Sequence, residues 1–448
     1  MRMRFFGMLA GFAMVFTGAA QAQQPPTFHC GELGDNHLPQ IAPNFRSSTD
    51  LSDNNFDCLA WQDFIYFMWP ATYGQRGVPN KNGKFGGGGP TVWETFKTTD
   101  AVFLPNGQNP GPWNQATLLA TLRGSLAQQV AAGAVRHLTM SSKVSRGVLA
   151  NILQSSGSMP PDILDAIAQA GGGTLFDLNG YPVYYEVSMN EAQFNYIVQN
   201  GLYDANKQLA FAQNNVIILP GSTATAQAAV EIKAAWKVLT PADIRSGHFH
   251  MVQALLDGAQ QPITVGLVGF HFFLSNGGQG AWATFAQVDN APVQQPATSG
   301  TFNFFNPKCT VFVSGRSQPC PFNIKDADPA QVVQVNPDDP TAAELNAYMK
   351  YLLQGYSPWQ YYKLVNVQWA TVPQPLAKQT APAPTPLPDG APNTPTLVNA
   401  VLETFLQKPN MSCVSCHQYA TVAAVGKQKP NIAASYSFMF KRASPGPQ

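Results

Sequence analysis

The segment Cys413-Val414-Ser415-Cys416-His417 constrains this chain more than any other stretch, through both its spacing and its position. C-x-x-C-H is the attachment sequence of c-type haem. Two thiols one helical turn apart reach the two vinyl groups, and the histidine beside the second thiol is carried under the iron. In a chain of 448 residues only 31 follow His417. Because so short a tail cannot enclose a haem, we expect the large preceding domain to supply one wall of the pocket.

Two other uses of paired cysteines fit this segment less well. A redox-active C-x-x-C of the thioredoxin type follows a strand in an α/β domain and needs no adjacent histidine. A zinc site needs a second pair of ligands, and none lies nearby in the sequence. The motif therefore predicts one covalently attached haem c, with Cys413 and Cys416 as thioether anchors and His417 as axial ligand.

The N-terminal residues predict export, which provides the compartment where such haem is attached. Two arginines precede an apolar run from Phe5 to Phe16, and Ala20-Gln21-Ala22 forms an A-x-A cleavage site. The run is too short to span a bilayer, so residues 1–22 are predicted to be a signal peptide. We expect a periplasmic or secreted product that begins near Gln23 and has no membrane anchor once the signal is removed.

Charge and composition narrow the range of partners. Without Arg2 and Arg4, 24 basic residues stand against 25 acidic ones, a formal net charge of −1. Neither nucleic acid nor an anionic membrane is favoured as a partner. Charged residues make up 11% of the chain, against roughly 25% in average globular proteins. The composition predicts a large buried core, and the 37 glycines and 37 prolines predict many loops.

The four remaining cysteines predict structural disulfides, because exported thiols are usually oxidised. Four cysteines allow three pairings. We favour Cys30 with Cys58 and Cys309 with Cys320, since the members of each pair are near one another in sequence. The second bond would clip the turn-rich segment "CTVFVSGRSQPC".

The predicted fold class is α+β: a large domain over residues 23–370, built on a mixed, mainly antiparallel sheet with packed helices. Strands are expected at 181–189, 230–238 and 263–274 and in the segment "GAWATFAQVDNAP", which ends in an Asp-Asn-Ala-Pro turn. The alternation in 230–238 predicts one core face and one solvated face. Helices are expected at 58–70, within 115–133 and 160–173, and at 340–355.

The last eighty residues are predicted to form a linker and an appendage. Residues 371–395 contain eight prolines and read as a semi-rigid connector. Residues 396–448 form a short helical segment that carries the haem and packs on the large domain. Its first helix is expected to begin at Thr394-Pro395 and to place Leu397, Val401 and Phe405 on one side.

Several residues compete for the second axial position of the iron. Met439 is the only methionine after the motif, although a packing role in "SFMF" explains it too. His271 lies in an otherwise apolar strand, where a core histidine with one hydrogen bond is the alternative to a ligand. His248 and His250, two residues apart, are a weaker candidate for a metal pair. Glu94, Glu186 and Asp289 are scattered in sequence and suggest no acid–base pair.

The chain also resembles the secreted bacterial proteins described as cytochrome c family proteins, large single-haem chains with C-x-x-C-H near the C-terminus. The resemblance is carried, in order, by "WQDFIYFMWPA", "TVWETFK", "EIKAAWKVL", "VGLVGFHFF", "WATFAQVDNAP", "NTPTLVNAVLETFLQ", "SCVSCHQYA" and "SYSFMF". It implies haem binding and electron transfer. Members often have Glu-His where this chain has Ala286-Gln287, so no role for that histidine is carried over.

Three functions remain open at this point, of which the third is a haem that acts as a structural staple or a ligand sensor. The first is a periplasmic c-type cytochrome that transfers electrons to or from a redox partner protein or a small-molecule donor or acceptor. The second is a haem-dependent oxidoreductase, peroxidase-like or oxygenase-like, with an open distal site in a pocket of the large domain.

Overall fold

A computed structural model describes most of the chain outside its N-terminus. The described residues are 30, 53–116, 124–131, 133–138, 173–223, 226–275, 280–356, 358–369, 396–408, 411–428 and 430–447. The predicted signal peptide, the proline-rich connector and residues 160–172 of the predicted helix at 160–173 lie outside them. Within these ranges, none of the helices combines the length and the apolar character that crossing a membrane requires.

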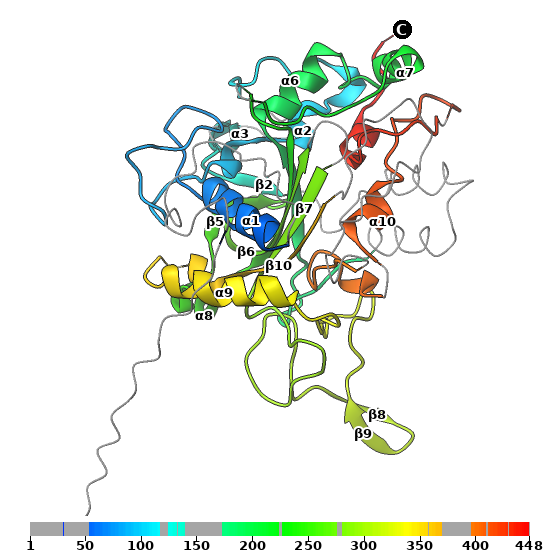
Figure 1. The fold of residues 1–448 in the computed structure, drawn as a ribbon. Helices are drawn as coiled ribbons and strands as arrows, with labels where there is room; N and C mark the ends of the chain where they lie inside the picture. Colours follow the sequence, from blue (N-terminus) through cyan, green and yellow to red (C-terminus); the bar gives the residue numbers. More distant parts are fainter. Residues whose placement is uncertain are drawn as a thin grey trace, which may run out of the picture.

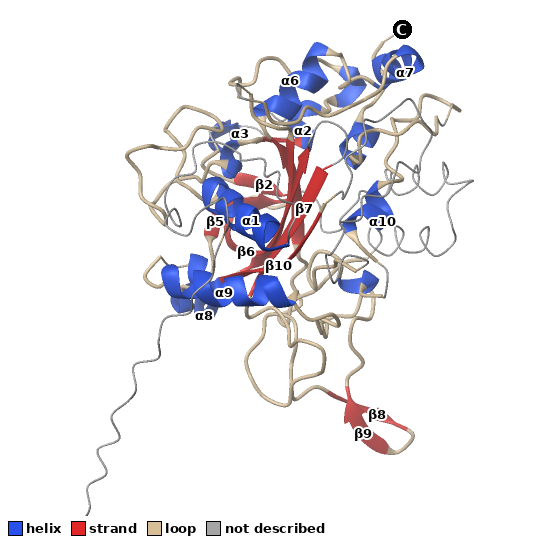
Figure 2. Cartoon of the chain, viewed as in Figure 1, coloured by secondary structure: helices blue, strands red, loops and turns tan. Residues whose placement is uncertain are grey.

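An eight-stranded sheet forms the centre of the molecule (Figures 1 and 2). Its order is β1-β3-β4-β6-β5-β2, and β7 joins β6 to β10; every pairing is antiparallel except β2 with β5. The strands are β1 Lys97–Thr98, β2 Arg136–Leu138, β3 Tyr184–Met189, β4 Val230–Val238, β5 Met251–Leu256, β6 Ile263–Ser275, β7 Gly280–Gln287 and β10 Tyr362–Gln368. The predicted α+β class and the predicted strands are confirmed. Strands β5 and β10 were not predicted.

Helices surround the sheet (Figure 1). They are α1 Asp53–Phe67, α2 Thr99–Val102, α3 Gly124–Ala131, α6 Glu191–Gln199, α7 Ala205–Asn214, α8 Pro241–Ser246, α9 Pro340–Leu352 and α10 Cys413–His417, with 3-10 turns η3 Trp93–Thr95, η4 Pro105–Gly107, η5 Trp359–Tyr361, η6 Thr404–Leu406 and η7 Phe438–Arg442. The predicted helix α9 begins as expected, since Asp339 accepts hydrogen bonds from the backbone N–H groups of Thr341 and Ala342.

Helix α1 covers one face of the sheet, as its apolar sequence predicts. Phe64 stacks on Phe285 of β7 at 4.4 Å between ring centres, and Phe67 meets Phe272 of β6 edge-on at 5.1 Å. Aromatic pairs at these distances add to the stabilisation that burial alone provides. Phe270 and Phe272 of β6 therefore point toward α1, and the residues with odd numbers from 269 to 273 point to the opposite face.

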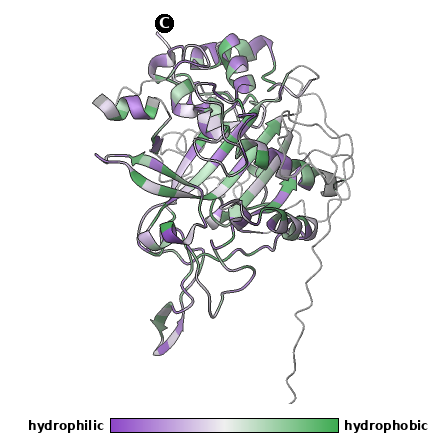
Figure 3. Cartoon of the chain, turned by 90° about the vertical axis from the view of Figure 1, so that its left-hand side faces the viewer, coloured by the Kyte–Doolittle hydropathy of each residue, from purple (hydrophilic) through white to green (hydrophobic). Residues whose placement is uncertain are grey.

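The opposite face is covered by the C-terminal residues, which corrects one expectation. Strand β4 was predicted to have a solvated face, but that side is half-buried or buried along its whole length. In Figure 1 the orange and red C-terminal chain lies on the side of the sheet away from α1. Side chains of this chain meet the sheet directly, because Leu402 packs over Gly269 and Ser437 hydrogen-bonds Glu231. In Figure 3 hydrophobic residues run along the sheet strands enclosed by these two layers.

The predicted helix after Pro395 is wrong, and Asn399 supplies the reason. Its side-chain oxygen accepts hydrogen bonds from the N–H groups of Val401 and Leu402, and its amide donates to Thr284 Oγ1 and to the carbonyl of Phe285. These bonds offer the backbone an alternative to helical pairing and tie it to β7. Residues 396–403 consequently form turns, and only the short η6 follows.

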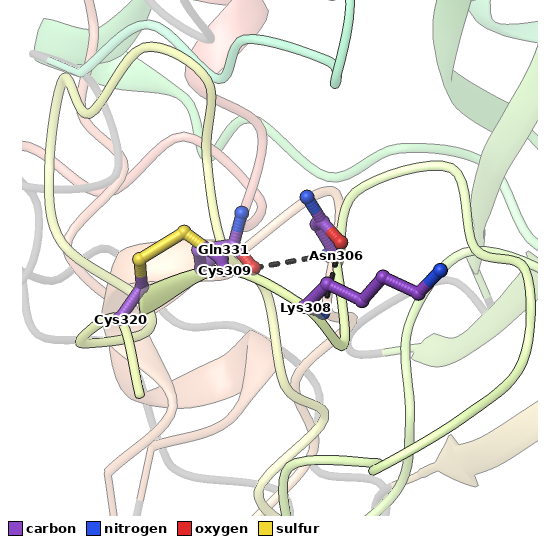
Figure 4. Close-up of a disulfide and its surroundings, with 5 residues drawn as sticks. All are labelled: Asn306, Lys308, Cys309, Cys320 and Gln331. Carbon is purple, nitrogen blue, oxygen red and sulfur yellow. Dashed lines mark hydrogen bonds between the residues drawn. A yellow bond between two sulfur atoms is a disulfide. The ribbon is translucent and has the colours of Figure 1, made fainter. Parts of the chain in front are cut away.

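Both predicted disulfides are confirmed, Cys30–Cys58 and Cys309–Cys320. The second closes the base of a hairpin, β8 Thr310–Val313 and β9 Arg316–Pro319, which projects from the body (Figures 1 and 4). The hairpin turns through Ser314 and Gly315, both with positive φ, as a tight two-residue turn requires. Beside the disulfide, the N–H of Asn306 donates to Gln331 (Figure 4).

A buried charge network lies on the α1 face, where the sequence suggested only scattered carboxylates. The guanidinium of Arg136 makes a bidentate ion pair with Glu186 and also donates to the carbonyl of Glu94. Glu94 in turn bonds His250 Nε2 at 2.8 Å. Trp93 and Trp236 both lie within 6 Å of the guanidinium. Every ionic group here is thus paired, which burial demands.

Replacing Arg136 by Met should destabilise the fold strongly, because two buried carboxylates would lose their shared cation. We expect the free energy of unfolding in urea to fall by about 3 to 5 kcal/mol. The matched control is Arg442→Met, which breaks an ion pair with the half-exposed Asp100 and should cost no more than about 1 kcal/mol. Equal losses in the two variants would contradict this assignment.

Glu94 should make the fold sensitive to acid. Burial alone would raise its pKa, but His250 first, and then Arg136, outweigh burial and lower the pKa to about 2. A carboxyl with a folded-state pKa below its unfolded value stabilises the fold above pH 4.5, and that contribution disappears as the pH falls toward 2. The stability lost over this window should be on the order of 3 kcal/mol. Urea unfolding at a series of pH values provides the measurement. As the pH falls from 4.5 toward 2, the free energy of unfolding should decrease less in Glu94→Gln than in the wild type.

Candidate haem-attachment site

Helix α10 is a single helical turn that presents the C-x-x-C-H residues. Its start is fixed by a capping box: the N–H of Ser415 donates to Ser412 Oγ at 3.3 Å, and the N–H of Ser412 donates to Ser415 Oγ at 2.8 Å. Cys413 and Cys416, three residues apart, lie on one face of this turn. They are not joined in a disulfide. The helix therefore directs both thiols to one side, as attachment to a single planar group requires.

The thiol of Cys413 does not have the character of a redox cysteine. Burial, and then the charge of Glu403, raise its pKa well above the ordinary value. Reactive C-x-x-C thiols have lowered pKa values, because the thiolate is the attacking species. Cys413 is therefore held as a neutral thiol, which argues against the disulfide-exchange interpretation of the motif.

His417 is oriented as a metal-binding imidazole should be. Its Nδ1 lies 2.7 Å from the carbonyl oxygen of Tyr436, so Nδ1 carries the proton and Nε2 keeps its lone pair. Burial lowers the pKa of His417 to about 4, and the charges of Lys233 and His271 act in the same direction. The ring is consequently neutral near pH 7, the form that coordinates iron.

Side chains of the sheet strands β7 and β10 contact this helix. Gln368 of β10 accepts a hydrogen bond from the N–H of Val414. Trp282 of β7 lies 6.4 Å from the His417 ring, and Phe438 of η7 lies 5.2 Å from it. The tail and the large domain thus both contribute side chains around His417.

The sheet face near α10 also carries a polar cluster formed by Lys233, His271 and Glu403. The Nε2 of His271 lies 2.9 Å from a carboxylate oxygen of Glu403. Lys233 of β4 stands directly opposite His271 in the strand register. The histidine thus has the single hydrogen bond expected of a core residue, but it lies beside two charged groups rather than in an apolar core.

Met439 is directed toward α6. Its sulfur accepts a hydrogen bond from Gln193 Nε2 at 3.4 Å, and its side chain is 2% exposed within the main core. The neighbouring Phe438 takes the place against His417. To reach iron, Met439 would have to leave both the core and its hydrogen bond.

His248 and His250 do not act as a pair. His248 bonds Asp289 at 2.8 Å and stacks on Tyr361, whereas His250 bonds Glu94 in the buried network. Among the residues that the structure describes, no group of three or more histidine, cysteine or acidic side chains could hold a metal ion.

The residues around α10 fit a covalently held haem. Two thiols on one helical turn would supply the attachment, and an imidazole with a committed Nδ1 would supply the axial ligand. Trp282, Phe438 and the nearby Met411 supply apolar contact surface. Two buried polar atoms on this side of the sheet, Trp282 Nε1 and His271 Nδ1, find no hydrogen-bond partner among the described residues.

A scan against protein-family models finds no match for this chain. The searches of curated proteins and of solved structures find no match either. What can be said of the site therefore rests on its geometry and chemistry.

Sequence reasoning missed Lys233, Glu403 and Trp282 as parts of this site. Lys233 was placed on a solvated face, and Glu403 on a helix that does not form. Two signals were available: His271 is a polar residue in an otherwise apolar strand, and Lys233 lies on the polar side of 230–238. Their pairing needed the strand register, which the sequence does not state.

Replacing Met439 by Leu should leave the visible spectrum of the holoprotein unchanged, because its sulfur faces Gln193. The swap conserves volume and should cost less than about 1.5 kcal/mol of stability. Absorption spectra of both redox states provide the measurement, including the weak long-wavelength sulfur-to-iron band of the oxidised form. Loss of such a band in the Leu variant would instead identify Met439 as the second axial ligand.

Proposed function

We propose that this chain is a periplasmic or secreted c-type cytochrome that carries one covalent haem and exchanges electrons with a redox partner protein or a small donor or acceptor. The observation that carries the proposal is the geometry of His417. This residue lies on the same helical turn as the two thiols, and its Nδ1–H donates a hydrogen bond to the carbonyl of Tyr436. The predicted signal peptide, the two disulfides and the resemblance to secreted cytochrome c family proteins support it.

Each residue has a defined part in this function. Cys413 and Cys416 would hold the haem, and His417 would be its axial ligand. When bound, the haem would supply one-electron redox chemistry. The Tyr436 carbonyl fixes the orientation of the imidazole and raises its basicity as a ligand. Trp282 and Phe438 limit the access of water to the proximal histidine.

Covalent attachment can be tested by expressing the full chain with its signal peptide in a host that performs haem attachment. The mass of the exported protein should increase by one haem, which should survive acid–acetone extraction. The variant Cys413→Ala/Cys416→Ala should lose it. The control, Cys309→Ser/Cys320→Ser, also removes two cysteines but should keep the haem. Export of the wild-type chain without haem would refute the proposal.

A second candidate function, a haem-dependent oxidoreductase, is favoured by the cluster of Lys233, His271 and Glu403. A simple carrier does not need three ionisable side chains on the sheet face that fronts the attachment helix. The polarity and hydrogen-bonding groups near a haem decide between electron transfer and ligand activation. A low-spin ferric spectrum would support the carrier, and a high-spin one would support the enzyme.

A further inference from the structure

His271 and Glu403 form a carboxylate-oriented imidazole. Glu403 Oε2 lies 2.9 Å from His271 Nε2, and the same oxygen accepts a hydrogen bond from the N–H of Asn399 at 3.0 Å. The carboxylate is therefore fixed in place by the turn that Asn399 builds. An imidazole whose N–H donates to a fixed carboxylate keeps its tautomer and its orientation.

The remaining nitrogen of His271 is available to accept a proton. With the proton on Nε2, Nδ1 carries a lone pair. Nδ1 is buried and has no hydrogen-bond partner among the residues that the structure describes. A proton taken up there would give an imidazolium beside Glu403, which stabilises it. The geometry is that of a general base.

This base lies on the side of the sheet that fronts the attachment helix. In the register of β6 and β7, His271 pairs with Thr284 and Phe273 with Trp282, so His271 and Trp282 occupy diagonal positions on one face. The Trp282 ring packs near His417.

His271 is better placed as a base than as an iron ligand. Its Nε2, the nitrogen farther from the strand, is committed to Glu403. Its Nδ1 is bonded to Cγ and is the ring nitrogen nearer the main chain, where the backbone of β6 hinders the approach of a flat macrocycle. A small molecule meets no such hindrance.

We propose that His271, oriented by Glu403, accepts the proton of a small neutral weak acid that binds at the haem from the sheet side. The H–X bond would break, the proton would move to His271 Nδ1, and the electron pair would stay on X⁻, the form that a bound haem would take up. Lys233, opposite His271, provides a positive charge that favours the anion. This inference rests on the proposed covalent haem and names the class of ligand at that site.

The test measures the rate at which cyanide binds to the ferric holoprotein, followed by stopped-flow absorption near neutral pH, where the added probe is hydrogen cyanide. Loss of a positioned base typically costs 10²- to 10⁴-fold. The association rate in His271→Ala should fall by about 10²-fold, and Glu403→Gln should change it in the same direction. His271→Gln can still donate to Glu403 but accepts no proton, and it should behave like the Ala variant.

The matched control is His248→Ala, which removes a histidine from a similar pair with Asp289, just before β5. Its rate should equal that of the wild type. When the pH is raised until cyanide ionises in solution, the base becomes unnecessary and the His271 variants should approach the wild-type rate. A deficit of constant size at every pH would show a merely structural effect and overturn the inference.

Two further outcomes separate this inference from the proposed function. A chain that carries no haem refutes the proposed function before cyanide is added. A haem-loaded His271→Ala or His271→Gln variant that binds cyanide at the wild-type rate overturns the inference alone. A wild-type low-spin spectrum that turns high-spin only in the His271 variants would make His271 an iron ligand and overturn it as well.

Discussion

Burial of β6 on both faces is the constraint on which the arrangement depends. Every even-numbered aromatic of this strand from Phe270 onward meets the α1 layer, so the odd-numbered side needs a second cover. The C-terminal chain provides that cover, with Leu402 over Gly269 and Glu403 on His271. A tail that completes the core of a large domain cannot act as an independent module. Its chemistry is therefore set partly by the sheet.

The elements with strong periodicity were predictable, and those fixed by tertiary contacts were not. The apolar run of α1 and the alternation of β4 specify their elements locally. The turn at 396–403 looked helical because Leu397, Val401 and Phe405 share a helical spacing, but hydrogen bonds from Asn399 to β7 override that pattern. Likewise, the C-x-x-C-H motif of α10 predicted its two cysteines and its histidine as site residues. The positions of Lys233 and Glu403 beside them depend on the strand register and on the turn at 396–403, which the motif does not specify.

The two histidine–carboxylate clusters on opposite faces of the sheet differ in one physical respect. In the network of Arg136, Glu94 and His250, each charged group has a charged partner, as a structural network requires. In the cluster with Glu403, His271 keeps one nitrogen without a partner among the described residues. An unsatisfied buried polar atom costs free energy, so its presence points to a functional use more strongly than the ion pair does.

The large domain provides a rigid support for side chains near the attachment helix. A haem would need a proximal histidine, attachment thiols and apolar cover, and the tail with Trp282 of β7 would provide these around His417. A rigid carboxylate–histidine pair on the same sheet face needs more, because His271 must be held in one place. Strands β4 and β6, locked into an eight-stranded sheet and covered by α1, supply that rigidity. A sheet that α1 buries on one side can hold side chains such as His271 in fixed positions on the other.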